Sequence, residues 1–132
     1  MHAMVYFAAK DMGDAARIAR RLLDTRLIAC ANIFPVRSLY RWKGKVEDET
    51  EAVAICKTRR GAVKRAIAEA KKVHPYEVPC IVSYDMGPAL AAYARWIDAE
   101  TAAKRNSLIG RRPRCSRPPA SGRSSRPRSS RT

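Results

Sequence analysis

The sequence predicts an α+β domain with the element order β-α-β-β-α-β and a terminal helix, the split βαβ arrangement. Short apolar runs that are typical of strands alternate with stretches whose apolar residues recur at i, i+3, i+4 and i+7, as in amphipathic helices. In addition, two long strand-like segments flank the turn Lys43-Gly44-Lys45, which indicates an extended central β-hairpin.

The first half of the chain contains one strand, one helix and the first hairpin arm. Residues 4–9 form a short apolar run that predicts a buried strand. Residues 13–26 carry a helical apolar stripe, with Asp14 in the first turn, where the helix dipole favours an acid. Residues 28–42 are strand-like, and Pro35 within them predicts a bend or a sheet edge.

The central hairpin is too long for a domain of this size. Its second arm covers residues 46–58, and arms of about 13 residues would reach about 43 Å. A body of this length has a diameter of about 33 Å, so the hairpin should project beyond it. Because exposed strand edges invite pairing with other chains, we expect a homo-oligomer in which the distal hairpin, residues 38–51, lies across a neighbour.

A rigid bridge joins the second helix to the last strand. The run His74-Pro75-Tyr76-Glu77-Val78-Pro79 contains two prolines, which fix φ and make the residue before each of them extended. The bridge should therefore hold a histidine, a phenol and a carboxylate in place. A helical stripe at Val63, Ala66, Ile67 and Ala70 precedes the bridge, and a strand at residues 80–84 follows it. A further helical stripe after this strand consists of Ala89, Leu90, Tyr93, Trp96 and Ile97.

The positive charge is concentrated at one end of the chain. The formal net charge is +15, but residues 104–132 contain ten basic residues and no acid, whereas residues 1–103 contain 17 basic and 12 acidic residues. We expect a folded domain over 1–103 and a disordered Arg/Ser/Pro-rich tail over 104–132. Nucleic acid would then bind only non-specifically, through this tail.

Several classes of protein are disfavoured. Neither a secretory leader nor an apolar stretch of 18 residues is evident, so we expect a cytoplasmic protein with no membrane partner. The four cysteines lack CxxC spacing and should be free thiols. Because no nucleophile elbow, P-loop, HExxH or glycine-rich fingerprint is present, we expect a binding protein and not an enzyme.

Several short pieces in one order give the chain a family resemblance. It resembles the CutA divalent-cation-tolerance family from about Met4 to Ile97. The pieces are Ile18-Ala19-Arg20, residues 27–33 (LIACANI), residues 38–45 (SLYRWKGK), Glu51, Lys57-Thr58, the run 74–79 and residues 93–97 (YARWI). The resemblance implies a ferredoxin-like fold, a tight homotrimer joined through the long hairpins, and a role in tolerance of copper and other divalent metals.

The chain departs from the family pattern at three places. Cys80 stands where the family usually has an acid, which replaces a hard oxygen donor with a soft thiol. Residues 8–11 (AAKD) lack the Thr and Pro usual at the end of the first strand. The tail has no family counterpart. It is read either as a basic arm or as a shifted reading frame in GC-rich DNA, and the second reading is favoured because the tail begins where family members normally stop.

The predicted metal ligands are Cys30, His74, Glu77 and Cys80. Thiolate and imidazole donors favour copper or zinc over hard cations, so copper or another divalent metal is expected. Three of these residues also have a plainer role: Cys30 as a small buried hydrophobe, His74 as a link between helix end and loop, and Glu77 as a partner for Lys57. The acidic cluster at residues 47–51 is expected to be solvated.

The predicted cleft between subunits is shaped by Tyr40, Trp42, Lys57 and Tyr76. Tyr40 and Trp42 are two residues apart on the hairpin and are expected to be interface anchors. The combined prediction is a trimeric, metal-responsive binding protein. The alternative is a trimeric sensor like the PII signalling proteins, which would bind a small anionic metabolite through Lys57 and nearby arginines.

Overall fold

A computed structural model describes residues 1–102. The order of elements is β1 (His2–Ala9), α1 (Met12–Asp24), β2 (Cys30–Trp42), β3 (Lys45–Arg59), a 3₁₀ turn (Arg60–Ala62), α2 (Val63–Val73), β4 (Ile81–Asp85) and α3 (Ala91–Glu100). The predicted βαββαβ order with a terminal helix is confirmed. No helix among the described residues is long and apolar enough to cross a membrane.

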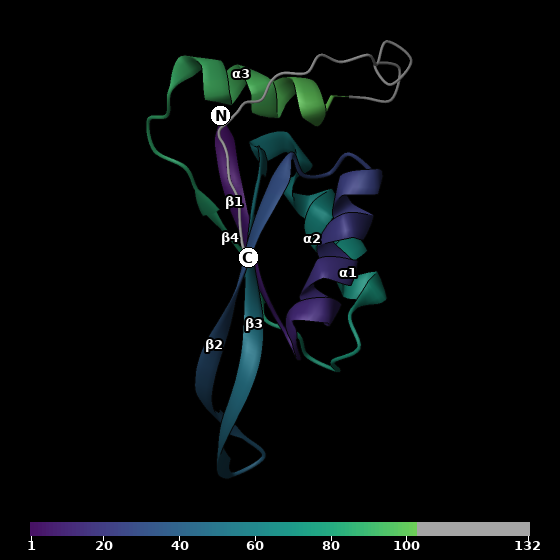
Figure 1. Cartoon of the computed structure of the whole chain (residues 1–132), viewed down its shortest axis with the longest axis vertical. Helices are drawn as coiled ribbons and strands as arrows, with labels where there is room; N and C mark the ends of the chain where they lie inside the picture. Colours follow the sequence, from purple (N-terminus) through teal and green to yellow (C-terminus); the bar gives the residue numbers. More distant parts are fainter. Residues whose placement is uncertain (103–132) are drawn as a thin grey trace, which may run out of the picture. The chain divides into compact units, whose positions relative to one another are not determined.

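The four strands form one antiparallel sheet in the order β2-β3-β1-β4. Helices α1 and α2 lie side by side on one face of this sheet (Figure 1). Side chains of β1 alternate between the faces, and Ala3, Val5, Phe7 and Ala9 are buried on the helix side. The core therefore lies between the sheet and these two helices.

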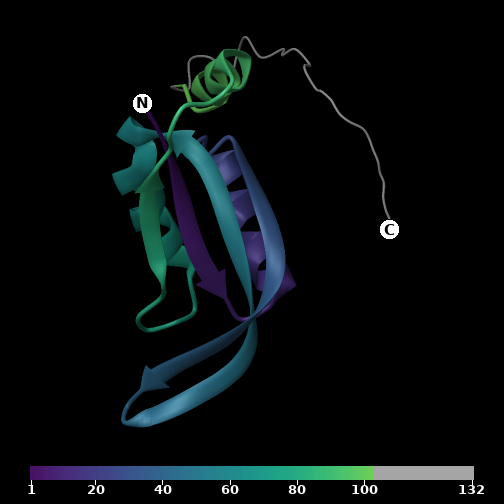
Figure 2. The same cartoon turned by 90° about the vertical axis from the view of Figure 1, so that its left-hand side faces the viewer.

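The opposite face of the sheet, here called the open face, is turned toward the viewer in Figure 2. The strand register places Tyr6 between Ile55 and Val82 on this face. Phe34 on β2 and Tyr84 on β4 also belong to it, and they remain 39% and 54% exposed. In the described part of the chain, helix α3 contacts only one end of the open face (Figure 1).

The hairpin of β2 and β3 extends past the end of α1 and α2 (Figure 1). Its ladder continues from Cys30↔Lys57 to Trp42↔Lys45. Pro35 lies in β2, which is an edge strand of the sheet. An edge strand tolerates a residue without an N–H donor, so the edge reading of this proline is confirmed.

Helix α1 ends two residues earlier than the prediction of Arg26. Arg26 has a φ of +58°, which a helix cannot contain. The Arg26 N–H donates to the Leu23 carbonyl and the Leu27 N–H to the Leu22 carbonyl, the two bonds of a Schellman ending. The apolar stripe continues past this point, so the periodicity predicted a helix longer than the one that forms. Helix α3 likewise begins at Ala91 because Leu90 is extended and caps it.

Candidate functional site

His74 ties the proline-bracketed bridge to the sheet. It caps the end of α2 in an extended conformation and is 8% exposed. Its Nε2 donates to the Ala8 carbonyl at 2.7 Å, while its Nδ1 accepts from the Tyr76 N–H at 3.2 Å. Both ring nitrogens thus serve the backbone. A metal ligand at His74 would have to give up one of these bonds.

Tyr76 binds a buried carboxylate. Its hydroxyl donates to Glu51 Oε2 at 2.7 Å, and Glu51 is only 7% exposed. The Tyr76 ring also lies against the His74 ring, with 4.7 Å between centroids. Burial, followed by the hydrogen bond to Glu51, raises the pKa of the Tyr76 phenol. Tyr76 therefore stays a neutral hydrogen-bond donor at physiological pH.

Tyr40 and Trp42 lie on the distal hairpin on the side of the open face. The Tyr40 hydroxyl donates to Glu49 Oε1 at 2.7 Å, and this bond is the main reason that its pKa is raised to about 12. Trp42 lies 5.6 Å from the Lys43 ammonium, measured to the ring centroid. Both aromatic residues are 38% exposed, so a surface is available for a further partner.

The two cysteines of the predicted ligand set lie far apart in one chain. Cys30 begins β2, and its Sγ is 3.4 Å from the Tyr93 hydroxyl. Cys80 precedes β4 and is exposed. β2 and β4 are opposite edges of the sheet with two strands between them, a separation of about 14 Å at ordinary strand spacing. Within a single chain these two thiols cannot share a metal ion.

The other predicted donors do not complete a cluster either. Glu77 is exposed, and Lys57 donates to the Asn32 side-chain oxygen, so the pairing of Lys57 with Glu77 is not formed. Over residues 1–102, no three His, Cys, Asp or Glu side chains lie together in a way that would hold a metal. The residues of one chain therefore do not fit a complete metal site.

Glu51 is a site residue that the sequence did not reveal, because it belongs to a run of acidic residues. It was expected to be solvated, but it is buried beneath Tyr76, and its charge also reaches Cys80. Partial burial, and then the charge of Glu51, raise the pKa of the Cys80 thiol. The available signal was its place directly before the buried apolar run Ala52–Cys56, where the strand enters the body of the domain.

The two remaining cysteines are Cys56, inside an apolar run, and Cys115, in the basic tail. Cys56 is fully buried, and this burial raises its pKa to about 12, which keeps it protonated and inert. Cys115 and the predicted tail lie outside the described residues. The described cysteines are free thiols.

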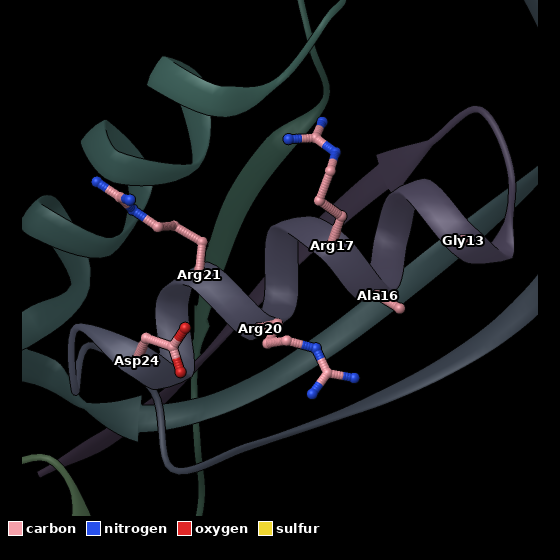
Figure 3. A pocket seen from close by; sticks show the side chains of 6 residues that line it. All are labelled: Gly13, Ala16, Arg17, Arg20, Arg21 and Asp24. Carbon is pink, nitrogen blue, oxygen red and sulfur yellow. The ribbon is translucent and has the colours of Figure 1, made fainter.

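A separate surface depression of about 410 Å³ lies along the outer side of α1 (Figure 3). Two of the three arginines that line it already donate hydrogen bonds to other residues. Arg17 donates to Asp14 and to the Val73 carbonyl, and Arg21 donates to Glu69. Arg20 points away from both of them (Figure 3). These groups do not converge on one point, so the depression is not a pocket for a small anion.

Comparison with known proteins identifies the family. The family model for the CutA1 divalent ion tolerance protein matches residues 3–100. The chain belongs to the CutA1 family. All eight predicted site residues lie inside the matched region, whereas residues 104–132 lie outside it.

The alignments with two relatives in the CutA1 family cover nearly the whole length of each relative. The divalent-cation tolerance protein CutA of Archaeoglobus fulgidus is 41% identical over 98 residues, 74% of this chain and 96% of the relative. That of Pyrococcus horikoshii is 38% identical with the same coverage. The solved structure of the Archaeoglobus fulgidus protein superposes with a TM-score of 0.76 at 39% identity, covering 77% of this chain and all of that one.

Proposed function

We propose that this chain forms a homotrimer that binds metal between its subunits and acts in tolerance of copper and other divalent cations. Membership of the divalent ion tolerance family supports the general role. The metal is an ion that the protein responds to or sequesters, and the proposed activity is binding without catalysis. A cytoplasmic location is part of the proposal, because a reducing compartment keeps Cys30 and Cys80 available as thiols.

The observation that carries the metal proposal is the position of Cys30 and Cys80 at opposite edges of the sheet. In a closed ring of three chains each interface is head-to-tail, so two different surface patches of the subunit meet. In the proposed ring the two patches carry Cys30 and Cys80, so that Cys30 of one subunit approaches Cys80 of the next. Glu77 lies in the bridge that directly precedes Cys80, and Tyr76 of the same bridge binds Glu51.

The ligand set predicts a preference among metals and a dependence on pH. Thiolates favour Cu(I) over hard cations. Because the pKa of Cys80 is raised, metal binding must displace a proton from this thiol, and affinity for Cu(I) should increase as pH rises toward the thiol pKa. The anionic-metabolite alternative has less support, because Lys57 already donates to Asn32.

Native mass spectrometry of the full chain under reducing conditions, with and without one equivalent of Cu(I) per chain, tests the proposal. We expect a three-chain mass that gains metal in whole-number steps. The double substitution Cys30→Ser and Cys80→Ser should abolish these steps and leave the three-chain mass.

The matched control is Cys115→Ser, a thiol outside the proposed site. It should leave Cu(I) uptake unchanged. A three-chain mass with diffuse metal adducts that the double substitution does not change would refute the intersubunit site but would still support the trimer. A one-chain mass would refute the assembly itself.

A further inference from the structure

The positive charge of the folded domain is concentrated on one layer. Residues 1–103 carry a net charge of +5. Helices α1 and α2 together contain seven basic and three acidic residues, a net of +4. These two helices form the face of the molecule opposite to the open face (Figure 1). We call them the helix layer, and an assembly through the open face leaves them in contact with solvent.

Two of the three acids of the helix layer are already paired, and the third, Asp24, is exposed at the end of α1. Asp14 has a side chain only 6% exposed and is paired with Arg17 at 2.8 Å. Glu69, 13% exposed, binds both Arg21 at 2.6 Å and Lys72 at 3.3 Å, and these pairs lower its pKa. One carboxylate thus serves two cations, and the link joins the basic side chains of α1 to those of α2.

Four further basic residues of the layer are uncompensated. Arg20, Lys64, Arg65 and Lys71 are exposed and have no ion-pair partner within residues 1–102. The tail cannot supply one, because residues 104–132 contain no acidic residue. Free cationic side chains over two adjacent helices make a surface that attracts polyanions.

The chemistry of the layer narrows the class of polyanion. Neither helix contains an aromatic residue, so stacking on the bases of a single strand is not available. Exposed large apolar side chains occur only near the ends of α1, at Met12 and Leu23, which leaves little to insert into a lipid surface. Arg20 points away from Arg17 and Arg21 (Figure 3), so these side chains do not converge on one small anion.

We propose that the helix layer binds the phosphate backbone of double-stranded nucleic acid without sequence preference. Arg20, Lys64, Arg65 and Lys71 make the contacts, and the cations held by Glu69 add to the field. Such binding is electrostatic and weakens steeply with salt, because each phosphate contact releases counterions. It is independent of the proposed metal site, since no predicted metal ligand belongs to α1 or α2.

The test is fluorescence anisotropy of a labelled 20-base-pair DNA duplex with the full chain over a series of salt concentrations. One variant carries Arg20→Gln, Lys64→Gln, Arg65→Gln and Lys71→Gln. A charge-matched variant carries Arg111→Gln, Arg112→Gln, Arg114→Gln and Arg117→Gln in the tail. Glutamine keeps helix propensity near that of Lys and Arg, and thermal unfolding and native mass verify that both variants are folded.

We expect the helix-layer variant to bind at least about tenfold more weakly at low salt, with the slope of log affinity against log salt reduced by about 3 to 4, because four phosphate contacts are lost. The tail variant should lose less affinity than the helix-layer variant. An equal or greater loss in the tail variant would overturn the proposal, as would the absence of duplex binding by the unmodified chain. An affinity for phosphatidylserine vesicles equal to that for the duplex would also overturn it. So would tighter binding of single-stranded DNA than of the duplex.

Discussion

At the scale of the residue, the most distinctive run of the sequence works as a joint. His74 binds the end of β1 through Nε2 and the bridge through Nδ1, which positions the Tyr76 hydroxyl over Glu51. A carboxylate that is 7% exposed would be costly without this donor. The bridge therefore supplies the hydrogen bond that offsets the burial of the Glu51 carboxylate.

The substitution Tyr76→Phe should destabilise the protein by about 1–3 kcal/mol, because it leaves a buried charged group without its hydrogen-bond donor. Urea unfolding at one fixed protein concentration measures this, since the stability of an oligomer depends on concentration. Tyr40→Phe is the matched control. Its hydroxyl donates to the exposed Glu49, so the loss of stability should be much smaller than that in Tyr76→Phe. Equal losses in the two variants would show that burial of Glu51 is not what gives the Tyr76 bond its value.

At the scale of the element, the hairpin depends on its turn. Lys43 and Gly44 have φ angles of +49° and +83°, and positive φ at both central residues is the requirement of a type I′ turn. That turn matches the twist of paired strands and continues the ladder of Trp42 with Lys45. Only glycine accepts such a conformation without steric cost.

Gly44→Ala should lower the free energy of unfolding by about 1–2 kcal/mol, because an L side chain is disfavoured in the left-handed region. The control is Gly61→Ala in the 3₁₀ turn. Its added Cβ would come no nearer than 3.8 Å to another atom, and its φ is not positive, so the change should be neutral or stabilising. Thermal unfolding of both variants compares them. Similar melting temperatures for the two alanine variants would contradict the role given to the turn.

At the scale of the whole molecule, the two faces of the sheet differ. One face packs on α1 and α2, while the open face exposes Phe34 and Tyr84 on its two edge strands. Large apolar side chains gathered on one face of a soluble domain mark an interaction site. This asymmetry supports assembly through the open face and leaves the helix layer outside.

The double substitution Phe34→Asp and Tyr84→Asp should convert the assembly to single chains, because it places charges in the proposed interface. The mass of the particle, measured by light scattering across a range of protein concentrations, reports the change. Leu23→Asp is the control, since Leu23 is similarly exposed at 41% but lies on the helix layer. If the double variant keeps the mass of the unmodified protein, the open face is not the interface.

The sequence by itself determined the elements, their order and the family. Apolar periodicity is a local property, so α1, α2, β1 and the long hairpin followed directly from it, and turn residues located the reversal at Lys43–Lys45. Short motifs in a constant order were sufficient for the family because each occupies a defined place in the fold. The end of α1 was missed because the left-handed Arg26 is not marked by a glycine.

Only the tertiary structure decided which site residues meet. Strand order is a long-range property, and it separates Cys30 from Cys80 by two strands although both adjoin strands of one sheet. It also brings Glu51, far from the bridge in sequence, beneath Tyr76, and it commits both nitrogens of His74 to the backbone. Local patterns specify which donors a chain has, but the distances between them depend on how the strands are ordered and on which edges face a second chain.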